Sequence, residues 1–159
     1  DRSPSRGLGD VYKRQAGDGF HGTSAVHSHM TNTRMTDPEV LETRFPVRLD
    51  EFSIRTGSGG GGEFQGGDGI IRRLRFLEPT TVTVLSSHRK VSPHGAKGGG
   101  SGQVGENSIL RANGEKEVLD GNDEAEMMFN DVFVLKSPGG GGFGFFVTVD
   151  VNTNQSGCL

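Results

Sequence analysis

Two histidines near the N-terminus have a spacing that suits shared chemistry. His27 and His29 are two residues apart, so on an extended strand both imidazoles would lie on one face, roughly 6–7 Å apart along the backbone. Two neutral imidazoles on one face can share a divalent metal, with Asp37 or His21 as a further ligand. A pair of histidines on a polar surface has the same pattern, so the spacing leaves both interpretations open.

The residues that follow the histidines could recognise a carboxylate or a carbonyl. Asn32, Thr33 and Arg34 bring an amide, a hydroxyl and a guanidinium into one short segment. A guanidinium can bind a carboxylate through two parallel hydrogen bonds. A surface loop has the same composition, so position alone does not decide between a binding segment and a loop.

A group of arginines lies further along the chain. Arg72, Arg73 and Arg75 could together bind an anion. Such residues are more typical of the solvated face of a strand. We therefore interpret them as surface residues of a strand.

Glycine is concentrated in three clusters, over residues 57–69, 95–105 and 139–144, and 21 of the 27 glycines lie between Gly57 and Gly144. Two windows, Gly57–Gly62 and Gly100–Gly105, match the dinucleotide-binding pattern G-x-G-x-x-G. That pattern needs a helix after the glycines to receive a pyrophosphate, and no helical periodicity follows either window. We therefore predict no cofactor-binding residues here, and expect the glycines to allow tight turns or close backbone approach.

The elements that must position these residues begin with a short helix. Asp37, Pro38 and Glu39 form a helix start, because an aspartate N-cap, a proline at the first position and an early glutamate all favour one. Pro46 limits this helix to about two turns, since the residue before a proline avoids the helical region. A strand is expected from Val47, with a bulge at Asp50–Glu51 where the alternation shifts by one residue.

A second strand is predicted over residues 70–77. Its alternation puts Ile70, Leu74 and Phe76 on one face, and Arg73 and Arg75 on the other. A turn at residues 78–79 leads into residues 80–85, which we expect to be the antiparallel partner of this strand.

A hairpin and one further strand complete the predicted elements. Asn113-Gly114 lies between residues 108–112 and 115–119, which is the sequence signal of a type I′ hairpin, and Val132–Leu135 forms another short strand. The sequence therefore predicts a mainly β fold, α+β at most, with antiparallel strands, long glycine-rich loops and one short N-terminal helix.

Composition excludes several classes of function. The chain of 159 residues has a formal net charge of −3 and a pI near 5.9, whereas nucleic-acid and membrane-surface binding need a basic excess. No run of eighteen apolar residues is present, so we expect no membrane span. Cys158 is the one cysteine and cannot form an intrachain disulfide, which fits a cytoplasmic protein.

Residues 1–15 are not part of the predicted fold. Residues 1–15, DRSPSRGLGDVYKRQ, have no periodicity and look like translated vector sequence. We expect them to be a non-native or disordered leader, with structure beginning near Ala16.

Three long blocks carry a resemblance to a known family. The first, Ala25–Pro79, contains AVHSHMTNTRMTDPEV and GDGIIRRLRFLEP; the second and third are LSSHRKVSPHGAKGGGSGQVGEN and DVFVLKSPGGGGFG. In order and spanning residues 25–144, they resemble the hydantoinase B/oxoprolinase family, most closely its 5-oxoprolinase branch. After Gly144 the family pattern continues into an acidic stretch containing proline, whereas residues 145–159 form a divergent tail.

The resemblance implies an ATP-dependent opening of a cyclic amide, either 5-oxoproline to glutamate or a hydantoin to an N-carbamoyl amino acid. A separate hydantoinase A-type subunit or fused half, with an actin-like ATPase fold, would bind ATP and phosphorylate the amide oxygen. The B-type part would complete the hydrolysis. Residues 16–144 would be a C-terminal segment of that B-type part, so we expect a fragment of a larger, oligomeric enzyme that is inactive alone.

The resemblance also implies site residues. A family block matches at His27, His29, Thr31, Asn32, Thr33, Arg34 and Asp37. On this basis His27 or His29 is a catalytic proton shuttle or substrate contact, while Asn32, Thr33, Arg34 and Asp37 bind substrate, with Arg34 on its carboxylate. A divalent metal would be held mainly by residues upstream of this fragment.

Two alternatives stay open at this point. The chain could be a non-catalytic interface segment of the same assembly, or part of an acetone-carboxylase-type subunit that shares the fold.

Overall fold

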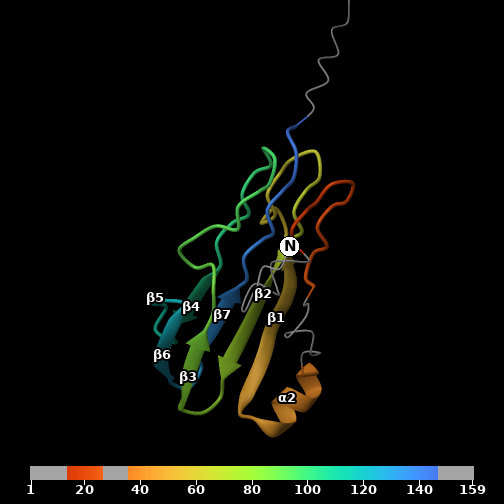
Figure 1. The fold of residues 1–159 in the computed structure, drawn as a ribbon. Helices are drawn as coiled ribbons and strands as arrows, with labels where there is room; N and C mark the ends of the chain where they lie inside the picture. The colour runs from red at the N-terminus through yellow and green to blue at the C-terminus, as the bar shows by residue number, and fades with distance from the viewer. Residues whose placement is uncertain (1–13, 27–35, 147–159) are drawn as a thin grey trace, which may run out of the picture.

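The computed structural model describes residues 14–26 and 36–146, which form an antiparallel β structure with a short helix (Figure 1). The elements within these ranges are α2 (Pro38–Arg44), β1 (Val47–Arg55), β2 (Gly69–Phe76), β3 (Thr80–Leu85), β4 (Glu106–Leu110), β5 (Lys116–Leu119), β6 (Asn122–Met127) and β7 (Val132–Lys136). Every strand pair is antiparallel. The predicted mainly β fold is confirmed.

Helix α2 begins and ends where its sequence predicts. The Asp37 carboxylate accepts a hydrogen bond from the Glu39 backbone N–H at 2.9 Å, and Pro38 is the first helical residue. The helix ends at Arg44 because Phe45, which precedes Pro46, is extended with φ −131° and ψ 148°. No helix in the described ranges is long and apolar enough to cross a bilayer.

The main sheet has five strands in the order β1-β2-β7-β4-β5. Strand β7 comes last in the sequence but lies in the middle of the sheet, between β2 and β4. The register between β1 and β2 shifts between Leu49 and Glu51, which confirms the predicted bulge.

The predicted pairing of residues 80–85 with β2 is wrong. Both sides of β2 are occupied, by β1 and β7, and β3 instead pairs with β6 in a separate two-stranded sheet. Val84 on β3 packs into the core together with Ala125 and Met127 on β6. Strand β6 was not predicted, because Asn, Asp and Glu supply most of its residues and only two apolar side chains mark its inner face.

The hairpin at Asn113-Gly114 joins β4 and β5 as predicted, but its turn is not type I′. A type I′ turn needs positive φ at both central residues, and here Gly114 alone in the turn has it, at +91°. The Gly114 N–H donates to the Arg111 carbonyl at 2.9 Å, and the Arg111 N–H donates to the Glu115 carbonyl at 2.8 Å. The connection is therefore a three-residue loop with glycine as its left-handed residue.

The β3–β6 sheet covers part of one face of the main sheet (Figure 1). The core between the two sheets consists of Val47, Phe76, Val84, Ile109, Leu119, Ala125, Met127 and Phe133. Leu41 of α2 packs against this core from the side of β1. The core is small for the length of the chain, so other interactions must hold the remaining residues.

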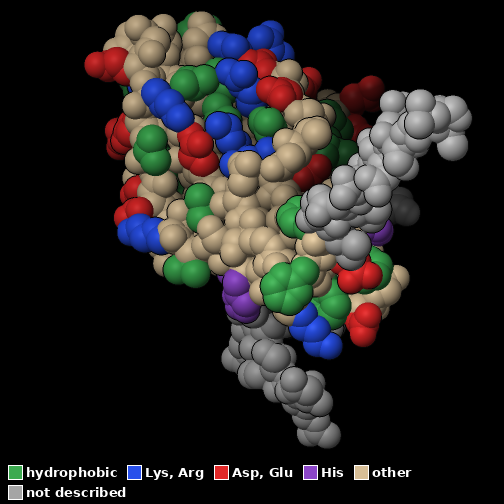
Figure 2. Space-filling model, turned by 90° about the horizontal axis from the view of Figure 1, so that it is seen from above, with side chains coloured by type: hydrophobic (Ala, Val, Ile, Leu, Met, Phe, Trp, Pro, Cys, Tyr) green, Lys and Arg blue, Asp and Glu red, His purple; other side chains and the backbone are tan. Residues whose placement is uncertain are grey.

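The glycine clusters lie at the end of the sheet opposite α2 and bond to each other through their backbones (Figure 1). The Gly60 N–H donates to the Gly140 carbonyl at 2.8 Å, and the Gly142 N–H donates to the Gly100 carbonyl at 2.9 Å. A methyl group at Gly60 or Gly142 would lie within 3.0 Å of neighbouring backbone atoms. Close backbone approach is therefore confirmed as the reason for glycine at these positions, whereas Gly57 has a positive φ of +78° and open space around it. Figure 2 looks down onto this end, where backbone and uncharged polar side chains cover a broad area with hydrophobic side chains at its rim.

Two residues of the expected leader belong to the packed domain. Arg14 is buried and its guanidinium donates to Ser137 Oγ at 2.9 Å and to the Pro138 carbonyl at 2.7 Å. The Gln15 side chain bonds to the His94 carbonyl and to the Gly141 N–H. Residues 1–13, and residues 147–159 of the expected tail, lie outside the described residues.

Candidate functional site

Most of the predicted site segment falls on residues that the structure does not describe. His27, His29, Asn32, Thr33 and Arg34 lie within residues 27–35, outside the described residues. Their roles therefore stay predictions.

The structure does describe the residues on both sides of this segment. Before it, the Ala25 N–H donates to the Asp68 carbonyl at 2.9 Å, and Ser24 Oγ accepts from the Asp68 N–H at 2.9 Å. After it, Asp37 begins α2, which packs against β1. The segment thus connects the glycine end of the sheet, next to the start of β2, with the helical end.

Asp37, predicted to bind substrate, is exposed and uses its carboxylate to cap α2. We expect Asp37→Asn to leave stability and activity near wild type, because asparagine caps a helix as well as aspartate. Asp37→Ala should lower the free energy of unfolding by about 1 kcal/mol through loss of the cap. Denaturant unfolding together with KM checks this, since a change in KM for Asp37→Asn would assign the charge to substrate instead.

His21, the further metal ligand considered for the histidine pair, has a structural role. Its Nδ1 accepts a hydrogen bond from the Gln65 N–H at 2.9 Å, and its ring meets Phe64 edge-on at 5.5 Å between centroids. Within residues 14–26 and 36–146, no group of three histidine, cysteine or acidic side chains is placed to hold a metal ion.

Arginines at the glycine end of the sheet donate to uncharged oxygens. Arg55 donates to the carbonyls of Val104 and Ser137 at 2.7 and 3.1 Å. Arg89 donates through Nε and Nη2 to Asn107 Oδ1, at 3.1 and 3.0 Å. Burial lowers the pKa of Arg89, and the nearby charges of Arg55 and Arg14 lower it further. These guanidiniums tie the glycine loops to the sheet.

The face of the main sheet away from β3 and β6 holds a cavity of about 480 Å³. It is lined by Arg48, Arg73, Arg75, Leu77, Leu110, Arg111, Ala112, Asn130 and Val132. Each of its arginines also has a carboxylate partner: Asp50 pairs with Arg48 and Arg75, Glu51 with Arg73, and both Glu117 and Asp131 with Arg111. The cavity is therefore close to neutral, and an anion entering it would compete with carboxylates already in place.

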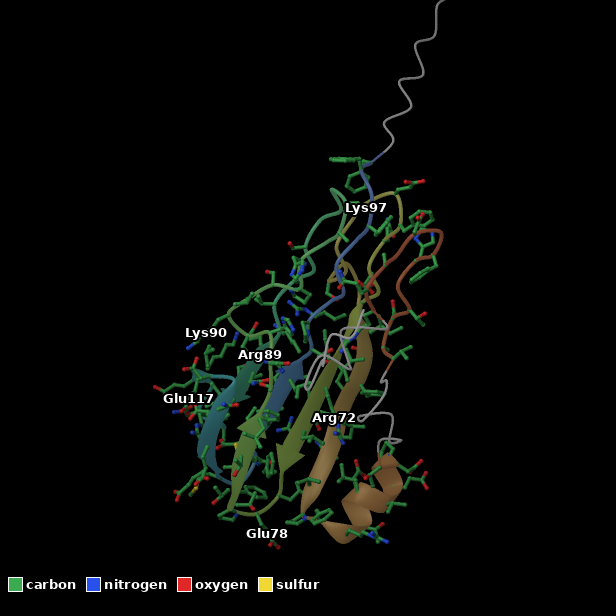
Figure 3. The ribbon with its side chains drawn as sticks, in the orientation of Figure 1. Arg72, Glu78, Arg89, Lys90, Lys97 and Glu117 are labelled. Atoms are coloured by element: carbon green, nitrogen blue, oxygen red, sulfur yellow. The ribbon has the colours of Figure 1, made fainter. Side chains whose placement is uncertain are left out.

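Arg72 differs from these arginines in both its face and its partners. It follows the alternation of Ile70 and Leu74, so its side chain lies on the face that carries the core, not with Arg73 and Arg75. The surface role predicted for all three arginines therefore does not fit Arg72, which is half-buried. Figure 3 shows it beside the middle of β1 and β2.

Comparisons with known proteins identify the class of this chain. The sequence profile of the hydantoinase B/oxoprolinase family matches residues 14–145. The chain belongs to this family, as its sequence blocks predicted.

Within this family, the chain is similar to proteins named 5-oxoprolinase. The chain is 46% identical over 129 residues to a 5-oxoprolinase of Dictyostelium discoideum, and 43% identical over 129 residues to 5-oxoprolinase 1 of Arabidopsis thaliana. In both cases the match covers 81% of this chain and 10% of the relative. The chain therefore spans about a tenth of the length of these curated relatives.

A solved structure shares the fold. The ATP-dependent caprolactamase from Pseudomonas jessenii superposes with a TM-score of 0.73 at 25% identity, over 83% of this chain and 24% of that one. A nucleotide-free acetone carboxylase, at 18% identity and a TM-score of 0.60, shares the fold alone.

Proposed function

We propose that this chain is the C-terminal portion of the B-type part of an ATP-dependent enzyme that opens 5-oxoproline to glutamate. The observation that carries the proposal is the identity of 43–49% to proteins named 5-oxoprolinase, across most of the chain. The structural likeness to an enzyme that hydrolyses another lactam supports the same reaction class.

The chemistry explains why ATP is needed. A five-membered lactam is a stable amide that water attacks slowly at neutral pH. Phosphorylation of its oxygen by an A-type part, outside this chain, turns that oxygen into a leaving group and makes the carbon electrophilic. The B-type part then directs water to the carbon.

We also propose that the enzyme is a cytoplasmic oligomer of A-type and B-type parts.

Within this chain, we assign proton transfer and substrate binding to the segment before α2. His27 or His29 moves the proton of the attacking water or of the ring nitrogen, and Arg34 binds the substrate carboxylate beside Asn32 and Thr33. Any divalent metal would be held mainly outside this chain.

ATP-dependent release of glutamate from 5-oxoproline by the full-length enzyme tests the reaction. Hydantoin and caprolactam, assayed in parallel, show which cyclic amide is preferred. An enzyme that opens either of these at wild-type rates but leaves 5-oxoproline intact would contradict the proposed substrate. Carboxylation of a ketone would instead establish the acetone-carboxylase alternative.

Arg34→Ala should lower kcat/KM for 5-oxoproline roughly 10- to 100-fold, mainly through KM, because a charge-assisted pair of about 1.5–3 kcal/mol is lost. Arg44→Ala, a change of the same type in α2, is the matched control and should leave KM unchanged. If Arg34→Ala keeps both KM and kcat, Arg34 does not bind the carboxylate.

A further inference from the structure

Among the residues that the structure describes, Arg72 is a half-buried cation without a counter-charge. Its side chain forms no hydrogen bond or ion pair with any residue of 14–26 or 36–146, and its Nε is buried without a partner. Burial lowers the pKa of Arg72, as expected for a charge that has lost water. Buried charges in proteins are almost always paired, because an isolated one costs several kcal/mol.

The neighbours of Arg72 on the sheet are apolar. Phe52 on β1 and Leu135 on β7 lie directly opposite it in the register, so their Cβ atoms are roughly 4.5–5.5 Å from its own. Ile54 lies on the same face, two residues further along β1. Phe52 and Ile54 are both 53% exposed.

The core under the two-stranded sheet reaches Leu135, on one side of Arg72, but not Phe52, on its other side. The core beneath β3 and β6 includes Val47 and Phe76, at the helical end of β1 and β2, but not Phe52 or Ile54. Phe52, Ile54 and Arg72 thus form an apolar surface with one cation in it, which we name the β1–β2 patch. β1 is also an edge strand of the main sheet.

We propose that the β1–β2 patch is an internal docking surface, covered by another segment of the same enzyme that presents an aspartate or glutamate among apolar residues. Charge complementarity is the reason to expect a carboxylate in the covering segment, since the Arg72 guanidinium offers a fork of N–H donors that suits one. The residues beside that carboxylate should be apolar, because Phe52 and Ile54 gain most from contact with apolar side chains.

The greater length of the relatives supports a covering segment from the same protein. The chain covers only a tenth of its curated relatives and 24% of the caprolactamase chain, so such enzymes contain ample further sequence to cover this face. The inference goes beyond the proposed reaction, because it concerns how this segment is seated in the enzyme whichever cyclic amide is opened.

Photo-crosslinking in the full-length enzyme tests the proposal. A benzoylphenylalanine residue is placed at position 52, and the crosslinked peptides are identified by mass spectrometry. We expect a peptide from the same polypeptide or its assembled partner part, outside residues 14–146, that carries an aspartate or glutamate. A crosslink to the same patch of a second copy, or to peptides without an acidic residue, would overturn the proposal.

Adjacent arginines supply the matched variants. Arg72→Gln should lower the Tm of the enzyme by roughly 2–4 °C and reduce the crosslink yield, because a carboxylate is left unpaired. Arg73→Gln, one residue away on the opposite face and paired with Glu51, should change neither measurement. If Arg72→Gln instead raises KM for 5-oxoproline with Tm and crosslink yield unchanged, the occupant is substrate and the proposal fails.

Discussion

Gly142→Ala should abolish the soluble, folded enzyme. The added methyl group would lie within 3.0 Å of the backbone oxygens of Gly60 and Gly61, and neither atom can move without breaking the bonds between loops. Overlap with fixed backbone costs more than about 4 kcal/mol, a large part of the 5–15 kcal/mol that holds an ordinary domain folded. Soluble yield and thermal unfolding measure the loss.

Gly114→Ala is the matched control for this substitution. A methyl group at Gly114 meets nothing within 4 Å, so the change costs only the strain of its positive φ, about 1–2 kcal/mol. The variant should stay soluble with a modestly lowered Tm. Equal stability of the two variants would show that the glycine loops can separate without harm.

Asp131→Ala should lower the free energy of unfolding by about 2–4 kcal/mol, because it leaves two backbone N–H groups without their acceptor and leaves Arg111 with Glu117 as its remaining carboxylate partner. The buried carboxylate accepts hydrogen bonds from Arg111 at 2.8 Å and from the N–H groups of Ala112 and Met128, each at 2.9 Å. It thus joins the β4–β5 hairpin to the turn before β7. Denaturant unfolding checks the loss, and Asp120→Ala, in an exposed pair with Lys90, should cost less than about 1 kcal/mol.

The Asp131 carboxylate also makes the free energy of unfolding depend on pH in the acidic range. Burial alone would raise the pKa of Asp131, but the hydrogen bonds from Met128, Arg111 and Ala112 outweigh it and lower the pKa below the ordinary 3.8. A lowered pKa stabilises the fold above the unfolded-state value, and that contribution is lost as pH falls through the folded-state value. The stability gap between wild type and Asp131→Asn should therefore be constant above about pH 5 and shrink below it. A gap that grows on acidification would contradict this role.

Local signals in the sequence predicted local structure well. The cap at Asp37, the stop before Pro46 and the bulge near Asp50 each depend on a few neighbouring residues, and each is confirmed. The turn at Asn113 was predicted in place but not in type, because the same dipeptide fits two hairpin geometries.

Pairing between distant segments was not predictable from these signals. Residues 80–85 would pair with whichever strand was free, and nothing local in β2 showed that β7 would occupy its second edge. Strand β6 was hidden by its polar residues, with Ala125 and Met127 as its only inward apolar side chains.

For the candidate site, the sequence showed which residue types are present but not which other residues lie around them. The capping role of Asp37 follows from its position before Pro38, whereas His27, His29 and Arg34 stay predictions. The position of Arg72 could have been found from its alternation with Ile70 and Leu74. Its lack of a counter-charge within the described part of the chain could not, because that depends on which carboxylates the fold brings near.

The placement of β7 has a consequence for synthesis on the ribosome. Until residues 132–136 emerge, β2 and β4 have no strand between them, so the nascent chain carries two open sheet edges. The last glycine cluster, which bonds to the two earlier ones, emerges later still. Folding of this region therefore waits for its C-terminal residues, and until they emerge the two open edges can pair with other strands.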